Sequence, residues 1–389
     1  MATEPQRAPG WRREPYRVLF PLGAGLAVVA VLPFVAGGAG GGALGVFHPL
    51  AQIDGFLSCF LAGVLFTFVP RQTRTPPPGR WQMLAALALP LASVASAWAG
   101  RGALAHGLWL ALAAVVLGFT VRRVRVAGGT PPPAVAVWVP LSILAGATGA
   151  LLSALAPLAS ATSAPRAWII GRGLLAQGFV TGLVLGVGAI LLPRLTRGED
   201  AVVLRPERLR RAAGLHAIAA LAFFGSFPVE VLYDARLGMA LRALVATLVL
   251  VLAAGIHRPP TLPGVHRQLV WIASWLLPLG FWLAALAPRL RTAALHVVFV
   301  GGFTQLTLAV AAHVVLSRGG RGPALEESPW TARAVAALLA LAVGARLLAA
   351  IDLARIPFWL AVAGMAFIGA VLAWAALVRP VTTASGGSP

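Results

Sequence analysis

Long, uninterrupted apolar runs recur along this chain and constrain its fold more than any other feature. A helix needs about 20 apolar residues to cross the hydrocarbon core of a bilayer. Runs of about that length lie at 18–36, 48–70, 81–99, 103–121, 134–157, 168–193, 213–234, 237–256, 268–288, 293–317, 330–351 and 357–378. Such runs are typical of membrane helices, because barrel strands are short and alternate. The sequence therefore predicts an all-α integral membrane protein with about 12 transmembrane helices.

The basic residues are distributed unevenly between the two ends of these helices. All 31 are Arg, and the net charge of +20 would suggest nucleic-acid binding in a soluble protein. Here 21 of them lie in the terminal segments and the even-numbered connections, whereas 6 lie in the opposite loops. Cytoplasmic segments are the ones enriched in Lys and Arg. We therefore expect a multi-pass membrane protein with both termini in the cytoplasm, lipid as a partner and no nucleic acid.

One short signature occurs three times: a Gly-Phe pair with Arg at fifteen and eighteen residues after the Phe. The copies begin at Gly55, Gly178 and Gly302, 123 and 124 residues apart. That offset is about four membrane helices, and an even number of helices restores the direction of the chain. We therefore expect three parallel four-helix repeats around an axis along the membrane normal. The units would span 17–125, 134–257 and 268–379 of one domain, 17–379, between a cytoplasmic tail, 1–16, and a disordered tail, 380–389.

Polar side chains within membrane helices are costly, so they usually have a partner or a function. Most of those in this chain fall toward the predicted outer surface, opposite to the loop charges. The outer group is His48, Gln52, Asp54, His106, Arg172, Gln177, Glu230, Arg242, His296 and Arg346, and the inner group is His216, His313 and Arg333.

The signature selects three residues from this outer group. Six residues before the shared Gly stand Pro49, Arg172 and His296, and His48 precedes Pro49. Each unit thus begins its second helix with a basic or imidazole group, and three units around an axis would bring the three together. His is the commonest metal ligand and also binds haem iron. The alternative for His48 and His296 is an interfacial side chain facing water or headgroups.

The other polar residues have two interpretations each. Arg172 is a candidate to bind an anion such as a haem propionate, or to pair with Glu230. Asp54 and Glu230 are candidates for proton relay or for hydrogen bonds between helices. Secondary site candidates are Gln52, Asp54, Gln177, Glu230, His106 and His313, whereas His257 and His266 are expected to face solvent in a connection.

The sequence lacks the common signatures of soluble enzyme chemistry. It contains no Walker motif, no Cys-x-x-Cys, no Cys-x-x-Cys-His and no Gly-x-Ser-x-Gly. Neither covalent haem attachment nor a hydrolase is indicated, and no catalytic residue is assigned. The single Cys, Cys59, excludes an internal disulfide.

Several ordered motifs resemble those of the NnrS family. They are Pro15-Tyr16-Arg17-Val18-Leu19-Phe20-Pro21-Leu22-Gly23-Ala24, His48-Pro49-Leu50-Ala51-Gln52-Ile53-Asp54-Gly55-Phe56, Val69-Pro70-Arg71, Gln177-Gly178-Phe179, Leu192-Pro193-Arg194, Ser226-Phe227-Pro228-Val229-Glu230, Leu295-His296, Gly301-Gly302-Phe303 and Leu308-Ala309-Val310. This family comprises polytopic bacterial membrane proteins that hold haem and copper and are linked to the nitric-oxide response. The resemblance implies a metalloprotein of the bacterial inner membrane that binds nitric oxide or a related small ligand.

Two departures limit what the resemblance implies about the site. Better-known members carry a second His where this chain has Leu50, and many carry a His where Ser317 to Arg321 stand here. The family's haem and copper therefore carry over to His48 and His296 only. Two other functions stay open: a transporter built from parallel repeats, for a small solute or a metal, and an assembly factor without a ligand.

Overall fold

The computed structural model describes residues 9–36, 42–126, 133–200, 204–327 and 329–382. Every regular element within these residues is a helix. Twelve spans in the described residues are long and apolar enough to cross a membrane, and each coincides with one of the twelve predicted runs. The prediction of an all-α protein with about 12 membrane helices is therefore confirmed.

The first third of the described chain contains α1 (Gly10–Arg13), α2 (Tyr16–Val35), α3 (Gly42–Leu50), η2 (Ala51–Leu57), α4 (Ser58–Thr73), α5 (Arg80–Trp98) and α6 (Gly102–Val126). The middle third contains η3 (Ala134–Val137), α7 (Trp138–Leu155), η4 (Ala156–Leu158), α8 (Ala164–Gly173), η5 (Leu174–Phe179), α9 (Val180–Leu183), η6 (Val184–Gly188), α10 (Ala189–Arg197), α11 (Pro206–Leu232) and α12 (Ala235–Leu252). The last third contains α13 (Val265–Leu286), η7 (Pro288–Leu290), α14 (Arg291–His296), η8 (Val297–Thr304), α15 (Gln305–Arg318), α16 (Gly322–Glu326), α17 (Trp330–Leu348), η9 (Leu353–Arg355) and α18 (Ile356–Thr382).

The helix bounds refine the predicted terminal segments. Helix α1 lies within the predicted N-terminal tail, and α18 continues to Thr382, beyond the predicted end of the membrane domain at 379. The rest of the predicted C-terminal tail, 383–389, lies outside the described residues.

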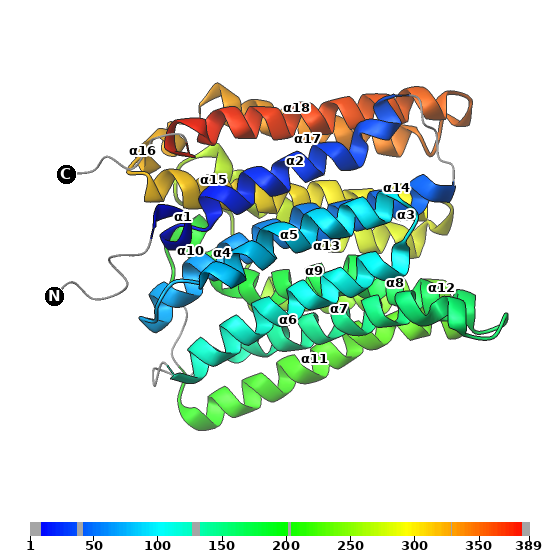
Figure 1. Cartoon of the computed structure of the whole chain (residues 1–389), viewed down its shortest axis with the longest axis horizontal. Helices are drawn as coiled ribbons and strands as arrows, with labels where there is room; N and C mark the ends of the chain where they lie inside the picture. The colour runs from blue at the N-terminus through cyan, green and yellow to red at the C-terminus, as the bar shows by residue number, and fades with distance from the viewer. Residues whose placement is uncertain (1–8, 37–41, 127–132, 201–203, 328, 383–389) are drawn as a thin grey trace.

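Helices of each third pack in the same order. Helices α5 and α6, α11 and α12, and α17 and α18 pair as hairpins. The last long helix of each third then contacts the first of the next, α6 against α7 and α12 against α13, and α18 returns to α2 (Figure 1). The contacts therefore run from the first third to the last and back to the first. Such a ring is compatible with three units around an axis, and the three-unit arrangement stays a prediction.

All three Gly-Phe signatures lie in π-helical segments. These are η2, η5 and η8, inserted into the spans Leu44–Thr73, Ala164–Arg197 and Pro288–Arg318. A π-helix bonds i to i+5 and is frequent at functional sites. Side-chain hydroxyls provide hydrogen bonds to backbone carbonyls in two of these segments. Ser58 donates to the carbonyl of Ile53 (2.8 Å) and Thr304 to that of Phe299 (3.0 Å), each five residues earlier.

Local sequence signals determine where several helices begin and end. The carboxylate of Asp234 accepts the Leu237 N–H at 2.7 Å and so caps the start of α12. Helix α10 is followed by Gly198, whose φ of +73° is the left-handed conformation that glycine adopts without strain. Two hydrogen bonds close this turn, from Gly198 N–H to Arg194 and from Glu199 N–H to Pro193.

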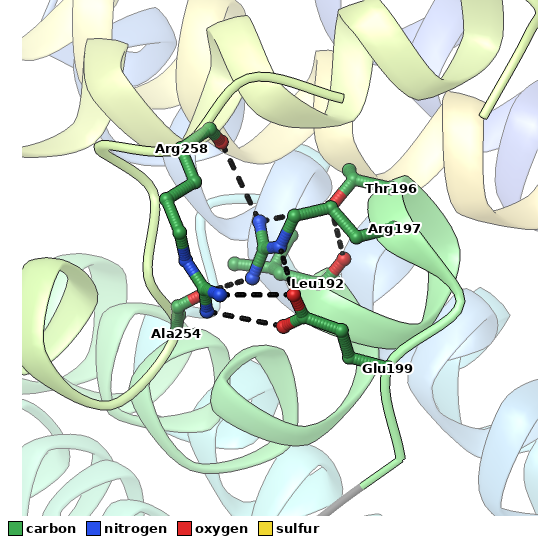
Figure 2. Close-up of polar contacts among 6 residues, drawn as sticks. All are labelled: Leu192, Thr196, Arg197, Glu199, Ala254 and Arg258. Atoms are coloured by element: carbon green, nitrogen blue, oxygen red, sulfur yellow. Dashed lines mark hydrogen bonds and ion pairs between the residues drawn. The ribbon is translucent and has the colours of Figure 1, made fainter. Parts of the chain in front are cut away.

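The second Arg of the middle signature connects two helix ends. Arg197 donates from Nη2 to the carbonyl of Ala254 (3.1 Å) and forms an ion pair with Glu199 (3.2 Å) (Figure 2). Arg258 contacts both oxygens of Glu199, at 2.9 and 3.0 Å. The end of α10 is thereby attached to the connection that follows α12.

The bundle surface is suited to lipid. Many large apolar side chains on the outward helix faces are exposed, including Leu84, Leu215 and Leu221. Trp81 and Trp98 are both exposed at opposite ends of α5. Their separation of 17 residues corresponds to about 26 Å along a helix. That length matches the spacing of aromatic residues at the two interfaces of a bilayer.

Candidate functional site

A cavity of about 560 Å³ opens at one end of the bundle. This cavity end is formed by α3, α8 and α14, which lie away from α1, α10 and α16 at the opposite end (Figure 1). The volume falls within the range of about 300–1,000 Å³ found for small-molecule and cofactor sites. Five basic or imidazole side chains line an otherwise largely apolar wall: His48, Arg172, Arg291, His296 and Arg346. The structure therefore places the three residues selected by the signature in one cavity.

His48 lies near the end of α3, before the π-helical segment η2. Its Nδ1 lies 3.0 Å from the carbonyl oxygen of Ala30 on α2. The ring also makes an edge contact with Phe34, with centroids 5.1 Å apart. A carbonyl only accepts, so Nδ1 carries the proton and Nε2 is the nitrogen available to a ligand.

His296 ends α14 and has an equivalent arrangement. Its Nδ1 lies 2.7 Å from the carbonyl oxygen of Thr292, one helical turn earlier. The Nη2 of Arg346 is also 3.5 Å from Nδ1 of His296, but Nδ1 already donates its proton to the carbonyl of Thr292. Nε2 is again the available nitrogen. A backbone carbonyl on Nδ1 is the usual partner that orients a metal-binding imidazole.

The π-helical segments form much of the cavity wall. Gln52 and Phe56 line it from η2, Gln177 from η5, and Phe299 and Phe303 from η8. Gln52 donates to the carbonyl of Ala27 at 3.3 Å. The glutamine candidates of the sequence analysis therefore belong to the same cavity as the histidines.

Asp54 and His106 lie elsewhere, away from the described cavity lining. Asp54 is completely buried and accepts a hydrogen bond from Ser93 at 2.9 Å. Its other carboxyl oxygen and Nδ1 of the buried His106 have no hydrogen-bond partner within the described part of the chain. Both residues belong to the packing between the first helices of the chain, since Ser93 also contacts the carbonyl of Ala105 at 3.1 Å.

Glu230 pairs with two other arginines instead of Arg172. Arg242 donates to one carboxylate oxygen at 2.8 Å, and Arg291 forms an ion pair with the other. The alternative of an Arg172–Glu230 pair is therefore not what the structure contains. The guanidinium of Arg172 lies 5.1 Å from the ring centre of Trp168, which also lines the cavity.

His313 belongs to a separate cluster at the opposite end of the bundle. Its ring stacks on His266 with centroids 5.4 Å apart, and their nearest ring nitrogens are separated by 3.4 Å. The expectation that His266 faces solvent is wrong, because it is 3% exposed at the start of α13. The same expectation for His257 is confirmed, since it is exposed.

Arg291, Arg346 and Trp168 line the cavity but are not among the site residues predicted from the sequence. Arg346 does carry a signal in the sequence, because it belongs to the polar group at the predicted outer surface. Arg291 lies in a predicted outer loop, and Trp168 lies in a predicted apolar run. The cavity draws these residues from different helices, so spacing within one helix could not group them.

These features define a class: a multi-pass helical membrane protein with a cationic, imidazole-containing cavity at one end of the bundle. The chain belongs to the NnrS family, whose model, described as "NnrS protein", matches residues 10–385. A search of curated proteins finds no match to this chain. Membership confirms the resemblance in the sequence and supports, at the level of the family, a membrane protein of the nitric-oxide response.

Proposed function

We propose that this protein binds a haem in the cavity and takes part in the response to nitric oxide. His48 and His296 are the iron ligands, and the cavity end faces the periplasm of the bacterial inner membrane, with both chain termini in the cytoplasm. One observation carries the proposal: both imidazoles donate Nδ1–H to a backbone carbonyl and keep Nε2 for a ligand beside one cavity. The orientation of the membrane rests on the distribution of Arg among the connections.

The donor set favours haem over a lone copper ion. No cluster of three or more His, Cys, Asp or Glu side chains suited to a metal occurs among the described residues. Two imidazoles suit haem, because the porphyrin would supply four nitrogens of its own and the protein would supply only the remaining ligands. Aromatic side chains such as Phe56, Phe299 and Phe303 give the cavity apolar walls. A bound haem would supply an iron for a small diatomic ligand such as nitric oxide. That ligand would take the place of one imidazole, because two histidines and the porphyrin would already fill the six positions of the iron.

An absorption spectrum and a metal analysis of the purified chain test this proposal. We expect a Soret band in the wild type that is lost or shifted in both His48→Ala and His296→Ala. His257→Ala is the matched control, because His257 is exposed in a connection away from the cavity. A wild type without a Soret band refutes haem binding, and stoichiometric copper in that sample would identify the alternative metal. Unchanged spectra in both variants would refute the assignment of the ligands.

A further inference from the structure

The arginines of the cavity have no acidic counterpart in its wall. Arg172 comes from α8, Arg291 from α14 and Arg346 from the last turn of α17. The described residues that line the cavity include no Asp and no Glu. Positive charge is therefore concentrated in a largely apolar space, where an unpaired ion is poorly solvated.

Arg172 and Arg346 have no ion-pair partner among the described residues. The guanidinium of Arg172 lies over the ring of Trp168. The Nε of Arg346 is buried without a hydrogen bond, and its Nη2 faces a nitrogen of His296 that already carries a proton. Both guanidinium groups thus retain donors for a ligand.

Arg291 is held in the wall by a buried network. It shares the carboxylate of Glu230 with Arg242, whose side chain is completely buried. Arg242 also donates to Oε1 of Gln177 at 2.6 Å and to Oγ of Ser226 at 3.1 Å. Because Oε1 of Gln177 is occupied, its amide NH₂ is the group left to donate toward the cavity. The network carries one acidic and two basic groups, so it adds a further positive charge.

We propose that the cavity binds an apolar molecule carrying two carboxylates, with Arg172 and Arg346 each binding one carboxylate. Arg291 and Gln177 supply further N–H donors. A guanidinium binds a carboxylate through two parallel hydrogen bonds. This explains why Arg, and not a side chain with a single donor, stands at these two positions. The inference rests on the proposed function: the molecule is the porphyrin of the haem, whose two propionates match the two unpaired arginines.

An anionic phospholipid also combines an anionic group with apolar chains. It differs in the position of its charge, because its phosphate stays at the headgroup level while its chains extend into the bilayer. The cavity has histidine nitrogens and arginines around one space of about 560 Å³, which suits a compact molecule better.

Binding of metal-free protoporphyrin IX to the full chain in nanodiscs of zwitterionic lipid tests the inference. The porphyrin has no iron, so its binding is independent of His48 and His296 as ligands. We expect its dimethyl ester, which lacks both charges, to bind at least about 10-fold more weakly. Arg172→Gln and Arg346→Gln should each weaken the acid by about 10-fold and leave the ester unchanged. Arg166→Gln, at an exposed position of the same helix as Arg172, is the matched control and should change neither.

The ester also reports folding, because a variant that binds it as the wild type does has kept its cavity. Equal binding of acid and ester, or acid binding unchanged in both arginine variants, overturns the inference. Displacement of the porphyrin by phosphatidylglycerol at comparable concentrations would assign the arginines to lipid and also overturn it. Each of these results leaves the proposed function intact if haem is still lost from the histidine variants. A wild type that binds no haem but shows arginine-dependent binding of the metal-free porphyrin would refute the proposed function and leave the assignment of the arginines standing.

Discussion

Replacing the buried Arg242 with Met measures how strongly the network behind the cavity holds α11 and α12 together. The guanidinium donates to Glu230 at 2.8 Å, to Gln177 at 2.6 Å and to Ser226 at 3.1 Å. It also lies 3.6 Å from the ring centre of Phe227. The side chain of Arg242 is 0% exposed and that of Glu230 is 8% exposed, so solvent cannot replace the lost contacts.

The size of the effect follows from which groups lose a partner. Breaking a buried ion pair costs about 3–5 kcal/mol when the remaining charge is left unpaired. Glu230 keeps Arg291, so we expect the lower end, about 3 kcal/mol, for Arg242→Met. Arg236→Met is the control, since this exposed Arg lies on the same helix and should change stability by no more than about 0.5 kcal/mol.

A double-mutant cycle of Arg242→Met with Glu230→Gln isolates the contribution of the pair. The assay is reversible unfolding in mixed micelles, followed by the fluorescence of the 12 Trp residues. Interhelical hydrogen bonds within membranes contribute about 0.6 kcal/mol on average. Hydrogen bonds to charged groups reach about 1.5–3 kcal/mol, so we expect a coupling energy of at least about 1.5 kcal/mol. A coupling at or below about 0.6 kcal/mol would refute the view that this charge pair joins α11 and α12.

Two further substitutions test contacts that hold the bundle ends. Arg197→Gln should lower the free energy of unfolding by about 1–2 kcal/mol, because it removes the hydrogen bond to the carbonyl of Ala254 after α12. Arg194→Gln is the control, since this exposed side chain should not change stability. Equal melting temperatures of the two variants would contradict this expectation. Gly149→Ala should cost about 1–3 kcal/mol, because its Cβ would lie 2.6 Å from the carbonyl oxygen of Gly171. Gly107→Ala, with no atom within 4 Å, should melt like the wild type, and similar melting of both Ala variants would disprove the close approach of α7 and α8.

The candidate site was predictable in part because its key residues stand at, or next to, one position of the repeated pattern. His48, Arg172 and His296 each precede the Gly-Phe pair in the same membrane span, and the structure places them in one cavity. Asp54 and Glu230 show the limit of the same reasoning. The sequence indicates how deep along its helix each of the two side chains lies. Depth alone does not say which face of the helix a side chain occupies. Asp54 contacts Ser93, and Glu230 contacts Arg242 and Arg291.

The two histidine clusters show a second limit. His266 and His313 are 47 residues apart and come from α13 and α15, which pack against each other. Nothing in the local sequence around His266 indicated burial, because it follows a connection rich in Pro and Gly. Its burial arises from the packing of α13 against α15 and α16, which lie far from His266 along the chain.

The sequence by itself determined the twelve spans and the family, because apolar length and ordered motifs are properties of neighbouring residues. The tertiary structure decided which polar groups share a space. Helices from the first and last thirds of the chain bring Arg291 and Arg346 beside the histidines. The carboxylate of Glu230 pairs with Arg242 and not with Arg172. Pairing in a membrane depends on which helix faces meet, since lipid offers polar groups no other partner.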